Sequence, residues 1–251
     1  TASNVKLLCC NKDTVTGSDV TPGTITAIGV PTPSTFGTGT ASDAKGGMVW
    51  IKSRDNAYWH SMVDTERGAN KTVYPNSSWQ EETLTNLLNS FNNNGFTPAY
   101  NSSYSQVFAN KNNDNYASWA FAKQEGFFDI QTWTGNNTAG RQIPHNLGSR
   151  PGMVAIKCTS DAHNWTVWHR GLSSNAKGLI LNDASAEYTT DDFNGAAPTS
   201  EVIYLSATNN SNGAGKTYVA YLWAGGASDE PGSARSVDFD GSGDYLLTSS
   251  S

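Results

Sequence analysis

Charged side chains are scarce in this chain of 251 residues: Asp, Glu, Lys and Arg make up 15% of it, where roughly 25% is typical. Asn, Thr, Ser and 24 glycines fill the gap. This mixture favours short strands joined by polar turns over helices with ion-paired surfaces. The 16 basic residues form no long cluster and the net charge is −6, so we expect no binding to nucleic acid.

Long apolar runs are also missing. No stretch approaches the roughly 20 apolar residues that a membrane-spanning helix needs, so we expect no membrane insertion. The N-terminal residues show no charged segment followed by an apolar one, and we therefore expect no signal peptide.

Cysteine is rare, with only Cys9, Cys10 and Cys158. Because the number is odd and two of the three are adjacent, the cysteines predict neither a disulfide framework nor a metal site. We interpret them as small buried hydrophobes in a reducing compartment. We predict no metal and no cofactor.

What the chain does contain is an internal repeat. Gly46–Gly68 resembles Pro151–Gly171, and Asn113–Gln124 resembles Ala214–Gly226. The anchors are four matched pairs: Trp59 with Trp165, Arg67 with Arg170, Gly68 with Gly171, and Tyr116 with Tyr218. Matched order at nearly constant spacing indicates two copies that fold alike. We predict a first repeat at residues 25–124 and a second at 125–227.

Both repeats show the alternating β-branched and aromatic pattern of strands. The predicted strands are Met48–Lys52, Ser61–Val63, Thr72–Tyr74, Gly95–Tyr100, Tyr116–Ala122, Phe128–Thr134, Met153–Cys158, Trp165–His169, Gly178–Leu181, Val202–Ala207 and Tyr218–Ala224. Asn- and Gly-rich turns separate them, which is typical of an antiparallel sandwich. The predicted fold class is all-β, with tandem antiparallel β-sandwich-like repeats and one short helix.

The short helix is expected within Ser77–Phe91. Leu84, Leu87, Leu88 and Phe91 recur there at intervals of three or four residues, behind an acidic first turn. This spacing predicts an amphipathic helix that lies across a sheet or its edge.

The repeat anchors have a structural interpretation. Trp165 and Trp168 fall on opposite faces of one strand, which predicts that this strand is covered on both faces. We interpret the anchor Trp and Tyr residues as packing groups. The Arg of each Arg-Gly pair is expected to bind turn carbonyls or a carboxylate, and the Gly to permit a positive φ.

Several segments together resemble a known family: GFFDIQTWTGN, IPHNLGSRPGMVAIKC, NWTVWHRGL, LILND and TYVAYLWAGG. They resemble a domain that recurs in large structural proteins of marine phages, cyanophages among them, between modules of concanavalin or laminin-G type. VKLLCC with TPGTITA (Thr21–Ala27) looks like the end of one such lectin-like module, and we assign residues 1–24 to the end of that module or a linker. Residues 228–251 look like a linker followed by SVDFDGSGDYL, the start of another.

The resemblance implies a virion structural protein, in a tail, tail fibre or related appendage, that spaces and displays neighbouring domains. It implies that the partners are other virion proteins or copies of the chain itself, in a homo-oligomer such as a trimer. It implies no catalytic residues, and the chain carries no nucleophile-elbow, phosphate-loop or dinucleotide motif. We therefore expect no enzyme.

Two features with possible chemistry have simpler explanations. The four histidines lack a metal-binding spacing and are expected to be structural or surface residues. Asp238–Gly243 opens like a calcium loop, but Ser249 stands where the bidentate Glu is required, so a hairpin turn explains it better.

Three other functions remain open. One is a carbohydrate- or receptor-binding module that attaches to host surface glycans through exposed aromatic side chains, for which the candidates are Trp79, Tyr100, Tyr104 and Tyr188. Another is a bacterial surface adhesin or an extracellular filament subunit. A depolymerase is the third, and it would need two convergent carboxylates in a cleft.

Overall fold

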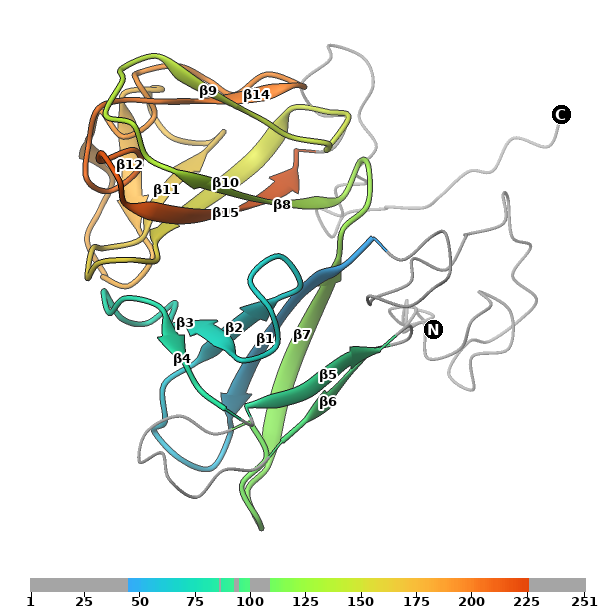
Figure 1. Ribbon diagram of the computed structural model, residues 1–251. Coiled ribbons are helices and arrows are strands. Elements are labelled where there is room, and N and C mark those ends of the chain that lie inside the picture. The colour runs from blue at the N-terminus through green and yellow to red at the C-terminus, as the bar shows by residue number, and fades with distance from the viewer. Residues whose placement is uncertain (1–44, 86, 93–94, 100–108, 226–251) are drawn as a thin grey trace, which may run out of the picture.

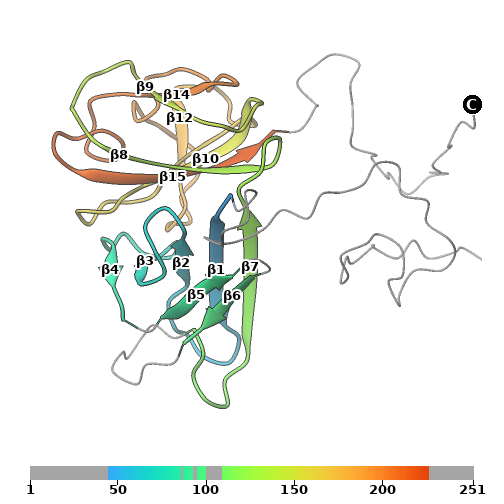
Figure 2. The same cartoon turned by 45° about the vertical axis from the view of Figure 1, so that its right-hand side comes forward.

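The computed structural model describes residues 45–85, 87–92, 95–99 and 109–225. These residues form two antiparallel sheets, stacked one above the other in Figure 1, with a two-stranded sheet beside each of them. The strands of the upper sheet run across those of the lower sheet (Figures 1 and 2). The predictions for 1–24, 228–251, Cys9, Cys10, Tyr100 and Tyr104 lie outside the described residues.

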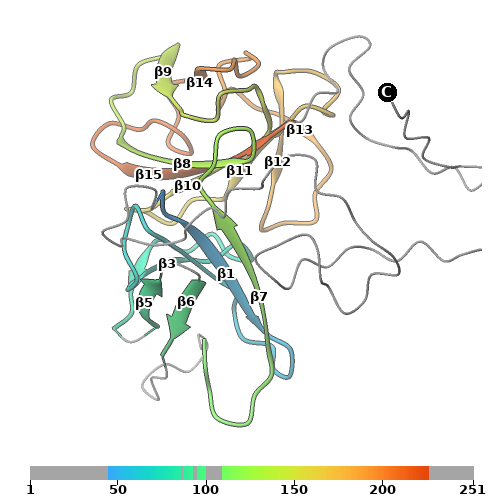
Figure 3. The same ribbon diagram turned by 90° about the vertical axis from the view of Figure 1, so that its right-hand side faces the viewer.

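The lower sheet has five strands in the order β4-β3-β2-β1-β7. Their bounds are β1 Gly47–Ser53, β2 Ser61–Asp64, β3 Lys71–Val73, β4 Glu82–Thr83 and β7 Tyr116–Ala122. A separate hairpin pairs β5, Leu88–Asn92, with β6, Gly95–Pro98. The chain then passes from β7 to the upper sheet (Figure 3).

The upper sheet has six strands in the order β13-β12-β11-β10-β15-β8. Their bounds are β8 Phe128–Thr134, β10 Pro151–Cys158, β11 Thr166–His169, β12 Lys177–Ile180, β13 Tyr188–Thr189 and β15 Thr217–Ala224. Here a separate two-stranded sheet pairs β9, Arg141–Pro144, with β14, Val202–Leu205. The all-β prediction is confirmed for the described residues.

The two sheets share one strand order. The sequence β4-β3-β2-β1-β7 in the lower sheet corresponds to β13-β12-β11-β10-β15 in the upper one, and β8 is added at the edge. The register is also the same, because Ser53 pairs with Tyr116 as Cys158 pairs with Tyr218. Tyr116 and Tyr218 therefore occupy equivalent positions.

The pairing of neighbouring strands shows that Trp59 and Trp165 do not occupy equivalent positions. Ile51 pairs with Ser61, and Ile156 pairs with Thr166, so His60 rather than Trp59 stands at the position of Trp165. Trp59 consequently packs on the outer face of the lower sheet, beside Tyr74, with the ring centroids 5.0 Å apart. A shift of one residue moves a side chain to the opposite face of a sheet.

Three apolar cores alternate with the two sheets. One lies between the lower sheet and the β5–β6 hairpin and includes Val49, Ile51 and Leu88. Another lies between the upper sheet and the β9–β14 strand pair and includes Ile156 and Ile203. The third joins the sheets and is built from both halves: Met48, Met62, Val73, Phe128, Ile130, Ala155, Trp165, Val167, Val219 and Tyr221.

Because of this inter-sheet core, the two halves share one interior rather than forming separate sandwiches. Trp165 faces the inter-sheet core and Trp168 faces the outer core, and each is at most 1% exposed. The strand that carries them is thus covered on both faces, as the sequence predicts. The Trp165 indole also donates a hydrogen bond across the junction to the Tyr74 carbonyl, at 2.8 Å.

The predicted helix at Ser77–Phe91 is wrong, since no helix occurs among the described residues. Leu84, Leu87 and Leu88 are buried in the lower core, but from a turn and the start of β5. Ser, Thr and Asn crowd this segment and favour turns over helices. The backbone also bonds to distant segments instead of to itself, with Leu84 N donating to Asn70 O at 2.8 Å and Glu81 N to Thr159 O at 3.0 Å.

Candidate functional site

A buried charge cluster joins the two halves. Asp64 ends β2, Arg67 lies in the turn before β3, and Tyr221 lies in the middle of β15. The Arg67 guanidinium binds Asp64 Oδ2 at 2.6 Å, and it donates to the Tyr221 hydroxyl at 2.9 Å. That hydroxyl in turn donates to Asp64 Oδ2 at 2.7 Å. The cluster therefore ties the lower sheet to β15 of the upper sheet.

Burial makes these contacts interdependent. The side chains of Asp64 and Tyr221 are inaccessible to solvent, and that of Arg67 is 6% exposed. Burial alone would lower the pKa of Arg67, but the charge of Asp64, with Tyr221 and Glu81, raises it above its usual value. For Tyr221, burial has the opposite effect and raises the pKa of the hydroxyl well above its usual value. The cluster is a neutral pair with a protonated tyrosine, and removal of any one partner leaves a buried polar group unpaired.

Arg67 therefore matches its predicted role, because it binds a carboxylate and also the Met62 carbonyl, at 3.2 Å. Gly68 has the predicted positive φ, at 105°. Gly171 does not, and that part of the prediction is wrong. A side chain at Gly171 would instead meet the His169 ring, whose Nδ1 would lie 3.1 Å from the added Cβ.

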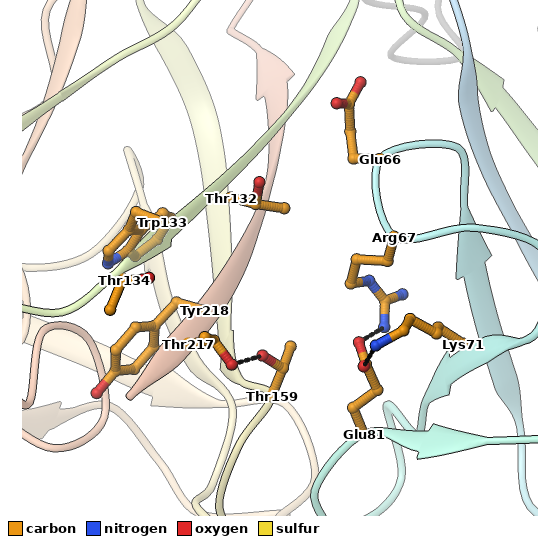
Figure 4. Close-up of a pocket in the computed structure, with 10 residues that line it drawn as sticks. All are labelled: Glu66, Arg67, Lys71, Glu81, Thr132, Trp133, Thr134, Thr159, Thr217 and Tyr218. Carbon is orange, nitrogen blue, oxygen red and sulfur yellow. Dashed lines mark hydrogen bonds and ion pairs between the residues drawn. The ribbon is translucent and has the colours of Figure 1, made fainter. Parts of the chain in front are cut away.

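A polar cavity of about 500 Å³ opens beside this cluster, between the two halves. Figure 4 shows charged residues on one side of it and threonines and aromatics on the other. The charged side comes from the lower sheet and its turns: Glu66, Arg67, Lys71 and Glu81. The opposite side comes from β8, β15 and the end of β10: Thr132, Trp133, Thr134, Thr159, Thr217 and Tyr218.

The charges in the cavity are paired. Glu81 binds Arg67 at 3.1 Å and Lys71 at 2.7 Å, and Glu66 binds Lys123 at 2.6 Å. Both carboxylates are thus engaged by cations, which does not favour a general acid and base of the kind that a depolymerase needs. The threonine hydroxyls and the paired charges are suited to a hydroxyl-rich ligand such as a sugar.

The two aromatic residues that line the cavity are largely buried and are part of its wall. Trp133 and Tyr218 stack with centroids 5.5 Å apart, but they are only 8% and 1% exposed. The Tyr218 hydroxyl accepts from Gly213 N and donates to Asn209 O, both at 2.8 Å. Its equivalent Tyr116 packs against the lower core and accepts from Lys111 N at 3.1 Å. The packing role expected of both tyrosines thus matches their surroundings.

The predicted binding aromatics do not come together in one site. Trp79, in the segment between β3 and β4, is 49% exposed. Tyr188 is half-buried in β13, and its hydroxyl lies 3.5 Å from Asp192 Oδ2. Sequence reasoning missed Trp119 and Phe127, which are 49% and 48% exposed. The residue pattern in and near β7 predicts a strand. It does not show which face of that strand other side chains leave exposed.

His145 is held as a neutral side chain. It follows β9, and it is buried. Leu147 N donates to its Nδ1 at 3.3 Å, so Nε2 carries the proton and donates to Thr199 O at 3.2 Å. Burial lowers the pKa of His145. A second proton on Nδ1 would face the Leu147 amide proton.

Arg67→Met is expected to lower the free energy of unfolding by about 3–5 kcal/mol, because it leaves Asp64 buried without its cation. Chemical denaturation measures this change. Lys71→Met is the matched control, since Lys71 is at the exposed end of the same network and should cost less than about 1 kcal/mol. Equal effects of the two substitutions would contradict the importance of the buried cluster.

Acidification should destabilise the protein through His145. Its folded pKa is below its unfolded value of 6.5, so the unfolded chain takes up a proton first, and stability falls as pH drops below about 6.5. In denaturation between pH 7.5 and 5, His145→Gln should reduce this slope. An unchanged slope in His145→Gln would exclude this residue as the source.

Comparison with known proteins adds one finding about the whole unit. Residues 23–229 match a family described as a domain of unknown function, DUF7483. This stretch includes both halves and the core between them. No curated protein and no solved structure matches the chain. Among the described residues, no helix has the length and apolar character needed to cross a membrane. Because the match covers most of its length, the chain belongs to the DUF7483 family.

Proposed function

We propose that this chain is a structural module of a phage tail, tail fibre or related appendage, which spaces and displays neighbouring domains in a homo-oligomeric assembly. The observation that carries the proposal is the position of the two ends of the described body. Lys45 Nζ donates to Gln124 Oε1 at 3.3 Å, and Ala224 N donates to Phe127 O at 2.9 Å. Both ends therefore lie beside the connector between β7 and β8.

In the proposed assembly, neighbouring domains attached at this edge would make the body project sideways from the shaft. The shared core and the Asp64–Arg67–Tyr221 cluster make that body one unit, so it can hold a fixed orientation. Such a body is suited to display. Other virion proteins or further copies of the chain are the proposed partners, and the virion is the proposed location.

A density map of the particle or filament that contains the chain tests this proposal. The expected result is a symmetric appendage in which the edge formed by Lys45, residues 123–128 and Gly225 faces the shaft. A freely diffusing monomer that is absent from such an assembly would contradict it. A secretion signal in the full gene, without neighbouring capsid and tail genes, would favour the adhesin or filament alternative.

Attachment to host glycans is a second candidate, favoured by the surroundings of Trp79. This half-exposed indole lies two residues before Glu81, which lines the polar cavity. An exposed aromatic beside hydroxyl and charged groups can stack on a sugar ring while the polar groups bind its hydroxyls. The cavity and Trp79 together would form one extended site.

Trp79→Ala is expected to weaken binding of the full chain to an immobilised host polysaccharide by about tenfold, which corresponds to about 1.4 kcal/mol. Trp119→Ala is the matched control, because Trp119 is equally exposed but belongs to β7. Equal losses in both variants, or no binding by the native chain, would contradict this second candidate.

A further inference from the structure

A cluster of three metal-ligand side chains follows β10, at the end of the upper sheet. Cys158 is the last residue of that strand, and Asp161 and His163 lie in the loop behind it. Their donor atoms all lie within 4.8 Å of one another. A thiol, a carboxylate and an imidazole gathered so closely differ in kind from the hydroxyls and ion pairs of the cavity described above.

The loop that presents these groups is fixed by hydrogen bonds. Thr159 N donates to Thr217 O at 2.8 Å, and Thr217 N donates to Ser160 Oγ at 3.1 Å, so the loop is tied to the start of β15. The buried Lys157 ammonium donates to the His163 carbonyl at 2.7 Å and to the Cys158 carbonyl at 2.9 Å. The Thr159 amide, the Ser160 hydroxyl and the His163 carbonyl are thus hydrogen-bonded to residues outside the loop. These bonds fix the positions of the loop's side chains.

The three donor groups differ in exposure, so the cluster is open to solvent on one side. Cys158 is inaccessible to solvent and is not in a disulfide, whereas Asp161 and His163 are partly exposed. A cation would therefore approach from solvent, between the carboxylate and the imidazole, and meet the sulfur beneath them. The Cys158 sulfur has a weak neighbour in Ser160 Oγ, at 3.7 Å.

We propose that Cys158, Asp161 and His163 form a binding site for a borderline divalent transition metal of the zinc type. One sulfur, one nitrogen and one oxygen ligand suit Zn²⁺ and its spectroscopic substitute Co²⁺, with water at the fourth position. Ligands of a tetrahedral site lie about 3.4–3.6 Å apart when the bond lengths are those of zinc. Closure by about 1 Å, which partly exposed side chains in a loop can provide, completes the site.

The charged groups that face the cluster determine its affinity. Lys216 forms an ion pair with Asp161, and Lys157 stands behind the loop. Lys216 pairs with Oδ2 of the carboxylate that the metal needs, so its positive charge competes with the metal for Asp161. Asp192 contributes an opposing negative charge near His163. The Tyr218 hydroxyl lies beside Cys158 and adds a further oxygen near the sulfur.

Metal at this position would fasten the loop to β10 and leave the remainder of the upper sheet unchanged. The site is independent of the proposed display role, because none of its ligands lines the polar cavity or the edge formed by the two ends. The sequence predicts no metal, because the cysteine count is odd with two of the three adjacent and the histidines lack a common metal-binding spacing. The loop conformation brings the three groups together.

Titration of the full chain, prepared without a histidine tag, with Co²⁺ under reducing conditions tests the proposal. The expected result is one equivalent of bound Co²⁺ with a sulfur-to-metal charge-transfer band and the visible bands of tetrahedral cobalt, all displaced by Zn²⁺. Cys158→Ser should abolish the charge-transfer band. His163→Gln and Asp161→Asn should each weaken binding by at least about tenfold to a hundredfold, since even loss of a ligand's outer hydrogen-bond partner costs that much.

Two further variants make the assignment specific. Lys216→Met should tighten Co²⁺ binding about tenfold, because it releases Asp161 and removes a positive charge. His169→Gln removes an exposed histidine outside the cluster and should leave binding unchanged. Circular dichroism of each variant checks that it is folded. Absence of the charge-transfer band in the native chain, or its persistence in folded Cys158→Ser, would overturn the proposal.

Discussion

The hydrogen-bonded contact between Arg67, Asp64 and Tyr221 is the interaction on which the arrangement of the two halves depends. Two apolar sheet faces can pack at many relative positions, because hydrophobic contact has no direction. A buried cation, a carboxylate and a hydroxyl that satisfy one another accept only one arrangement, since any displacement leaves a polar group unpaired in a dry interior. The apolar core supplies the attraction, and the charge cluster selects the register.

This contact also explains why the repeated halves are not interchangeable. Tyr221 occupies in the upper sheet the position that Trp119 occupies in the lower one, since each pairs with the residue at the centre of its neighbouring strand. Tyr221 is buried against the other half, whereas Trp119 is half exposed. The two sheets are thus similar, but the cluster gives them different surroundings. Tyr221 is closed off at the junction, whereas the equivalent part of the lower sheet, at Trp119, is exposed.

The sequence predicts the sheets better than the sites. The alternating apolar pattern locates β8 to the residue and most other long strands within one or two residues, because side chains of a half-buried strand must alternate. The same reasoning fails at Leu84–Leu88, where leucines at helical spacing are buried from a turn whose backbone bonds to other segments. It also misaligns Trp59 with Trp165, because a match of residue types does not include the strand register. The cavity, the cluster at Arg67 and the group at Cys158 all join residues that are distant in sequence or held by loop conformation, and periodicity carries no information about either.

Amide hydrogen exchange of the full chain under native conditions tests most directly whether the two halves form one cooperative unit. The account predicts that the slowest amides of β1 and β15 exchange with the same free energy of opening, equal to that of global unfolding, because neither sheet face can be uncovered alone. If the amides of β1 open at a free energy several kcal/mol below those of β15, the lower half unfolds independently, and the shared core does not join the two halves.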